Sequence, residues 1–408
     1  MVNPAEGTSG VERWTDALLD SMRQRGDPPA DRVIESLLAD REMPEARRLL
    51  RALVENDRPP PEGMPSEVLE YLNGFQVPTG SSAEAIQNGQ ELFAEHGPIM
   101  LMCLGCYSLP ASYAAAKGVK VLHRTAYLEK RPTKRLFETT QMVIDVMTPG
   151  GLEPGGRGVR TIQKVRLMHA MVRYLIKNDR ADPWPAELGV PINQEDLAGT
   201  LMAFVWGTLD GLFKLGVRPT PREQEEYLGA WRVVGRLMGI EEILIPRNVP
   251  EAEALKERIE LRQIAPSEEG RVLTRALLEV MERNSEIALL KHVPAALMRH
   301  FLPAYVADFL AIPKHRFEAL AVEALRLLAT GQELLTRDSP ALERAARSFS
   351  IHLIRWMISV ELGGRSAPFV VPVELHRRWR LAPEPTFLER VVQWFERRFR
   401  RLFRPRPR

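Results

Sequence analysis

The chain has 408 residues, of which 45% are hydrophobic and 27% are charged. This composition is typical of an ordinary globular protein and excludes an intrinsically disordered chain. The 56 lysines and arginines and the 53 aspartates and glutamates leave a net charge of +3, which gives no overall field that would attract nucleic acid.

The first residues, 1–7, contain neither a basic leader nor an apolar core, so no secretory signal is visible and we expect a cytoplasmic protein. Residues 11–58 are predicted to form two or three short amphipathic helices, because apolar residues recur there at helical spacing. A proline-rich run at 58–63 ends this block. We therefore predict that residues 1–82 form an N-terminal helical extension and a docking arm over the main domain.

Residues 83–315 show helical periodicity in one segment after another, and strand-like alternation is scarce. Glycine and proline break the pattern at 117–118, 148–151, 182–185 and 218–221. The sequence therefore predicts an all-α fold whose main domain spans residues 83–315.

Residues 97–116 contain no charged side chain, and their length approaches that of a membrane span. Gly105 and Pro110 interrupt the segment, which favours a buried core helix over a membrane helix. The only two cysteines, Cys103 and Cys106, have the spacing of redox and zinc sites. Because two cysteines form no disulfide framework and no further zinc ligands lie nearby in sequence, we predict two buried, unreactive thiols.

Arg135 and Thr139 are one helical turn apart, so a cation and a hydroxyl group would share one face of a helix. Two glycine pairs follow, at 150–151 and 155–156, and they would allow the backbone to lie close to a planar cofactor. A solvated, charged helix face is the alternative interpretation of this segment.

His169 lies in an apolar helical stretch, with Arg166 and Arg173 along the same side of the helix. This arrangement would suit a haem, since iron takes a histidine nitrogen and the two propionates need positive partners. The alternative is a core histidine whose neighbouring arginines reach solvent. Farther along, Asp210 is a carboxylate in an otherwise apolar helix, which marks either a functional group or a paired core acid.

Residues 316–408 are predicted to form C-terminal helices that end in a basic amphipathic tail. In the tail, 387–408, aromatic and apolar residues recur at helical spacing, and eight arginines lie between Arg390 and Arg408. This pattern is typical of a helix that lies in the plane of an anionic membrane surface. A helix docked on its own domain, with a solvated arginine face, is the alternative.

Several segments in one order resemble a single known family: 135–140 (RLFETT), 148–151 (TPGG), 165–170 (VRLMHA), 196–201 (DLAGTL), 227–235 (YLGAWRVVG) and 297–302 (LMRHFL). The family consists of haem-dependent oxygenases and includes the latex clearing proteins, which are rubber oxygenases, and the fungal MpaB oxygenases. The resemblance covers roughly residues 90–315, and it lies in the ordered set rather than in any single motif.

The resemblance implies an all-α fold in which a globin-like core carries a b-type haem and extra helices lie at both ends. His169 corresponds to the proximal iron ligand, whereas Arg135 and Thr139 correspond to pocket residues on the other side of the haem. In the rubber-cleaving branch a lysine directly before the pocket threonine can cap the iron, but this chain has Glu138 there. Glu138 is also the nearest candidate for the carboxylate base of that branch.

By this resemblance we expect an oxygenase that uses haem b and O2 to oxidise a hydrophobic unsaturated substrate, isoprenoid-like or lipid, with oxidative C=C cleavage as one outcome. In this hypothesis Arg135 stabilises developing negative charge and Thr139 donates or relays a proton. Arg166 and Arg173 pair with the propionates or with structural partners. The alternatives are a non-catalytic haem or lipid binder, such as a sensor or carrier at the membrane surface, and a haem-free helical scaffold.

Overall fold

The structure is a computed structural model that describes residues 13–39, 64–74, 83–129, 132–283 and 292–315, together with Arg326. Side chains are described for these residues except 39, 126–129, 132–137 and 283. The chain divides into two compact units, Met1–Val370 and Val371–Arg408, and every described residue belongs to the first.

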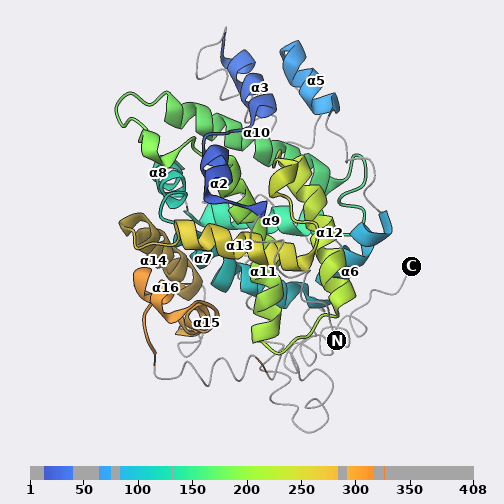
Figure 1. Cartoon of the computed structure of the whole chain (residues 1–408), viewed down its shortest axis with the longest axis vertical. Coiled ribbons are helices and arrows are strands. Elements are labelled where there is room, and N and C mark those ends of the chain that lie inside the picture. Colours follow the sequence, from blue (N-terminus) through green and yellow to red (C-terminus); the bar gives the residue numbers. More distant parts are fainter. Residues whose placement is uncertain are drawn as a thin grey trace, which may run out of the picture. The chain divides into compact units, whose positions relative to one another are not determined.

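The described part of the chain is helical and contains no strand beyond one isolated bridge between Ala115 and Ile264 (Figure 1), so the predicted all-α fold is confirmed. Its helices are α2 (Asp16–Arg23), α3 (Pro28–Ala39), α5 (Ser66–Gly74), α6 (Ala83–Cys103), η1 (Leu104–Ser108), α7 (Leu109–Tyr113), α8 (Val119–Glu129), α9 (Pro132–Met147), α10 (Arg157–Lys177), η2 (Ala186–Leu188), α11 (Gln194–Lys214), α12 (Pro221–Leu237), η3 (Glu242–Leu244), α13 (Val249–Gln263), α14 (Glu268–Arg283), α15 (Val293–Phe301) and α16 (Ala304–Phe309).

Helix α6 continues through the π-helical turn η1 into α7, which makes one helical run, Ala83–Tyr113. By length and composition alone, this is the one helix in the described ranges that is apolar enough to cross a membrane. However, 67% of its most apolar window is buried inside the protein. This burial agrees with the predicted core helix.

Helices α6 and α12 pack so closely that their backbones nearly touch. A Cβ atom on Gly89 would lie 2.5 Å from the backbone oxygen of Glu226, so only glycine fits there. Helix α12 begins with a capping box between Thr220 and Glu223, with Pro221 in its first turn. The predicted break at 218–221 is therefore the start of this helix.

A tight turn joins α9 to α10 and contains both glycine pairs. Gly150 and Gly155 have φ angles of 78° and 73°, a region that favours glycine. A Cβ atom on Gly151 would lie 2.0 Å from the backbone oxygen of Asp145, so the turn packs against the end of α9. The turn brings α10 back alongside α9, with which it is in contact.

Helix α10 has a separate apolar contact with α3 and α5, which lie beside it in Figure 1. Leu167, Ala170 and Met171 of α10 are buried against apolar residues of α3, among them Ile34 and Leu37. The apolar periodicity of the two segments therefore matches across the interface. This packing leaves another side of α10 for the contacts of His169.

Candidate functional site

A cavity of about 400 Å³ lies among α7 to α14, with the π-helical turn η1 in its wall. Most of the lining is apolar and includes Leu104, Val121, Met142, Val234 and Trp231. A cavity of this size and polarity is typical of sites that bind small molecules or cofactors.

Helix α10 presents His169 to this cavity. Val165, Met168 and Val172 line the wall on the same helix, so the imidazole is set in apolar surroundings. His169 is half-buried, whereas the next residue, Ala170, is fully buried against α3. The histidine therefore lies on the cavity side of α10.

Helix α9 places Glu138 and Thr139 in the lining of the same cavity. Glu138 is exposed and Thr139 is half-buried. Arg135 lies one turn earlier on α9, but its side chain is outside the described part of the structure. The structure thus brings three predicted site residues, Glu138, Thr139 and His169, to one cavity from two adjacent helices.

Arg166 and Arg173 are outside the cavity lining and have carboxylate partners. The Nε and NH2 groups of Arg166 donate to Asp27 at 2.6 and 2.8 Å. The Nε group of Arg173 donates to Asp31 at 2.8 Å and its NH1 group to the carbonyl oxygen of Ile192 at 2.9 Å. The structure therefore contains the structural pairing of these arginines, and their pairing with haem propionates stays a prediction.

The glycine pairs at 150–151 and 155–156 are likewise absent from the cavity lining, since they form the turn between α9 and α10. The hypothesis that they place backbone beside a planar cofactor is therefore not supported by this structure. Their positive φ angles and close backbone contacts explain the glycines without a ligand.

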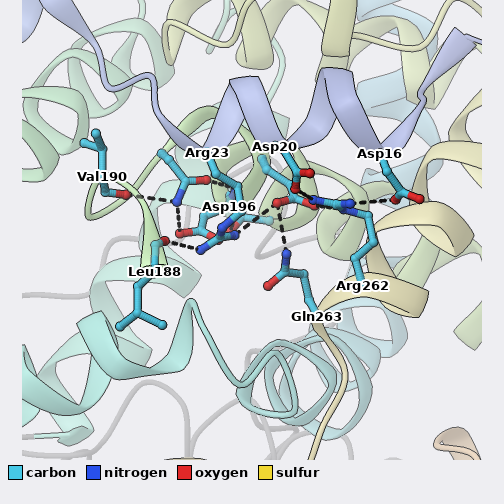
Figure 2. Close-up of polar contacts among 11 residues, drawn as sticks. Asp16, Asp20, Arg23, Leu188, Val190, Asp196, Arg262 and Gln263 are labelled. Carbon is cyan, nitrogen blue, oxygen red and sulfur yellow. Dashed lines mark hydrogen bonds and ion pairs between the residues drawn. The ribbon is translucent and has the colours of Figure 1, made fainter. Parts of the chain in front are cut away.

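A polar group to which no sequence motif pointed lines the cavity where α11 begins and α13 ends. It contains Glu195 and Asp196 of α11 and Gln263 of α13. Figure 2 labels Asp196 and Gln263. Arg23 NH1 donates to Glu195 at 3.1 Å and to Asp196 at 3.0 Å. Acidic residues in a first helical turn are ordinary in sequence, which explains why the pattern did not mark them.

Burial raises the pKa of the Asp196 carboxyl above its ordinary value, although the charge of Arg23 acts in the opposite direction. One turn from Gln263, Glu260 lines the cavity and pairs with Lys256 at 2.8 Å. Burial also raises the pKa of Glu260.

Asp210 is a paired acid. Its Oδ2 atom accepts a hydrogen bond from the hydroxyl of Tyr107 at 2.7 Å and lies 2.8 Å from the ammonium group of Lys214. Cys103 and Cys106 are buried, and burial raises the pKa of both thiols, that of Cys106 to about 12. Both therefore stay protonated at neutral pH, which agrees with the predicted unreactive thiols.

Across the residues that the structure describes, no three histidine, cysteine, aspartate or glutamate side chains gather as a metal site would require. The predictions for 316–408, including the lipid-binding tail at 387–408, lie outside the described residues apart from Arg326. They and the predicted domain boundaries stay predictions.

The family model for the catalytic domain of the ER-bound oxygenase mpaB/B' and rubber oxygenase matches residues 93–331. The rubber oxygenase of Streptomyces sp. (strain K30) is 25% identical over 315 residues, which cover 75% of this chain and 76% of that protein. Latex clearing protein in the closed state superposes with a TM-score of 0.70 at 24% identity, over 86% of this chain and 94% of that chain. The superposition shows a shared fold.

Proposed function

Because the chain belongs to the family of mpaB-type ER-bound oxygenases and rubber oxygenases, we propose that it is a haem-dependent oxygenase acting with O2 on a hydrophobic unsaturated substrate. The observation that carries the proposal is the position of His169, a side chain of a type that binds metals, in the mostly apolar lining of a cavity. Since a similar protein is named a rubber oxygenase, the substrate class we propose is isoprenoid-like.

The residues around the cavity fit a haem better than a bare metal ion. A protein-held metal needs several side-chain ligands, and no such group exists among the described side chains. A haem can be held by a single side-chain ligand, because the porphyrin supplies the other nitrogens, and it would need an apolar pocket. His169 and its apolar neighbours on α10 provide both.

In this proposal His169 would hold the haem, which supplies the oxygen chemistry when bound. The apolar lining binds the hydrocarbon part of the substrate and excludes water. The Thr139 hydroxyl donates a hydrogen bond inside the cavity, and the Glu138 carboxylate accepts a proton. Arg135, one turn from Thr139, adds positive charge that stabilises an anion formed near α9.

The proposal is tested by measuring O2 consumption with geraniol, a small unsaturated isoprenoid, and with its fully saturated counterpart. We expect consumption with geraniol alone, since the two molecules differ only in their C=C bonds. His169→Ala should lose both the haem absorption and the O2 consumption. His300→Ala is the control, because His300 lies on α15 outside the cavity lining, and it should retain both.

Two results would contradict the proposal. Protein that keeps its haem and binds geraniol without consuming O2 would be a carrier or sensor. A His169→Ala variant with full haem content and an unchanged spectrum would remove this residue as the ligand.

A further inference from the structure

The cavity has one strongly polar region, formed by Glu195, Asp196 and Gln263. Its two carboxylates are neutralised by arginines. Besides Arg23, the Nε group of Arg262 donates to Glu195 at 2.8 Å. Glu195 is completely buried, so this pairing is what makes its charge tolerable. Both carboxylates therefore have arginine partners within the protein.

Most other polar side chains that line the cavity also have partners within the protein. The hydroxyl of Ser108 donates to the carbonyl oxygen of Ala203 at 2.7 Å, and that of Thr200 donates to the carbonyl oxygen of Asp196 at 2.8 Å. The Tyr107 hydroxyl donates to Asp210, and Lys256 pairs with Glu260. These groups contribute little recognition of a ligand.

Gln263 differs from them. Its Nε2 group donates to Glu195 Oε2 at 2.9 Å, and because a carboxylate only accepts hydrogen bonds, this contact fixes which end of the amide is nitrogen. The Oε1 atom is the other end of the amide and has no hydrogen-bond partner among the residues that the structure describes.

Contacts with neighbouring residues hold Gln263 in place. Its backbone oxygen accepts a hydrogen bond from the Ala116 amide at 2.9 Å, which ties the end of α13 to the turn before α8. The residue is only 4% exposed. A buried carbonyl oxygen without a donor is costly, so its presence beside a ligand cavity calls for a donor from the ligand.

We propose that Gln263 Oε1 accepts a hydrogen bond from a hydroxyl group of the substrate. This inference rests on the proposed function and narrows its substrate class from any unsaturated hydrocarbon to an apolar alcohol. The apolar lining binds the hydrocarbon chain, and Gln263 selects for the hydroxyl end.

The test compares the binding of geraniol with that of geranyl methyl ether to the protein as purified, by equilibrium dialysis. The two ligands share one carbon chain, but only the alcohol donates a hydrogen bond. We expect geraniol to bind about five- to tenfold more tightly, the effect of one net hydrogen bond. In Gln263→Met this preference should fall to about one.

Gln90→Met is the matched control. Gln90 is as buried as Gln263 and donates to the carbonyl oxygen of Val146 at 2.8 Å, but it lies outside the cavity lining. The variant should keep the preference for the alcohol. Gln263→Leu serves as a second variant with the same loss, and Arg23 and Arg262 still pair with Glu195 in both.

Equal affinities for the two ligands in the unaltered protein would overturn the inference, since the hydroxyl group would then gain nothing from Oε1. So would an unchanged preference in folded Gln263→Met or Gln263→Leu. Binding requires no turnover, which separates this test from that of the proposed function. If the protein prefers the alcohol but consumes no O2, the inference about Gln263 stands and the oxygenase proposal fails. If it consumes O2 but binds both ligands equally, the oxygenase proposal stands and the inference fails.

Discussion

The buried charged side chains that the structure describes occur in pairs. Arg23 is 4% exposed and Glu195 fully buried, and each has more than one polar contact. Loss of one partner would leave the other as an uncompensated charge, which is much more costly than loss of an exposed pair. The polar network around Glu195 therefore also holds the α11 side of the cavity in place.

Glu251 gives a pH-dependent prediction at the residue scale. Burial alone would raise its pKa, but hydrogen bonds from Arg247 and the charge of Arg13 outweigh burial and hold the pKa below its ordinary value of 4.5. Because the folded pKa is the lower one, the stabilisation is present above the ordinary value and is lost as pH falls through the folded pKa.

We therefore expect Glu251→Gln to lower the melting temperature at neutral pH and to have a shrinking effect as the pH falls below 4.5. Thermal melts over that pH range provide the measurement. Glu253→Gln, an exposed position on the same helix, is the control. An effect of Glu251→Gln that is equally large in acid would show that the charge of Glu251 contributes nothing.

At the scale of elements, α10 is positioned from two sides. The side of α10 that faces the cavity carries His169. Two ion pairs, Arg166 with Asp27 and Arg173 with Asp31, connect α10 to the start of α3. The same region of the chain packs its apolar residues against α10. The N-terminal helices thus fix the helix that carries the candidate ligand.

The contribution of these pairs is measured by a double-mutant cycle on Asp27 and Arg166. Asp27→Ala leaves a guanidinium that is only 13% exposed without its carboxylate, and we expect a loss of about 3–5 kcal/mol in the free energy of unfolding. Adding Arg166→Met removes the unpaired charge and should recover a large part of that loss. Denaturant titrations give the values, and a double variant no more stable than Asp27→Ala would refute the pairing energy.

The crossing of α6 and α12 allows a comparison of two glycines. In Gly89→Ala the new Cβ atom would meet the backbone of Glu226 at 2.5 Å, and backbone cannot move aside as a flexible side chain does. We expect a loss of about 1–3 kcal/mol in unfolding free energy. Gly229 on α12 has its nearest neighbour at 3.9 Å, so Gly229→Ala should be neutral or stabilising by up to about 1 kcal/mol. Similar losses in the two variants would contradict this account of the crossing.

At the scale of the whole molecule, local patterns in the sequence predicted where the helices lie along the chain better than they predicted the contacts between helices. The break at 218–221 became the capped start of α12, and the apolar segment at 97–116 lies largely in a buried helical run. Helical spacing shows which side chains share one side of a helix, but not which residue faces them. The carboxylate partners of Arg166 and Arg173 are some 140 residues away in the sequence, so no local pattern identifies them.

In the candidate site, too, local patterns pointed to some residues, whereas contacts between distant segments became visible only in the fold. The spacing of the motifs, together with the family resemblance, drew attention to Glu138, Thr139 and His169, and these residues line one cavity, although their roles stay predictions. Gln263 and Glu195 come from the ends of two helices that are far apart in the sequence, and only the fold brings them together. The Oε1 atom of Gln263 is noticed because it is buried without a hydrogen-bond partner among the described residues, and a sequence alone does not show this.

The most direct test of the central claim is the absorption spectrum of the freshly purified protein, recorded before and after reduction. The account predicts a strong haem band at the violet edge of the visible spectrum that shifts on reduction, and its loss in His169→Ala. A colourless protein that stays without this band after incubation with haem would contradict the account.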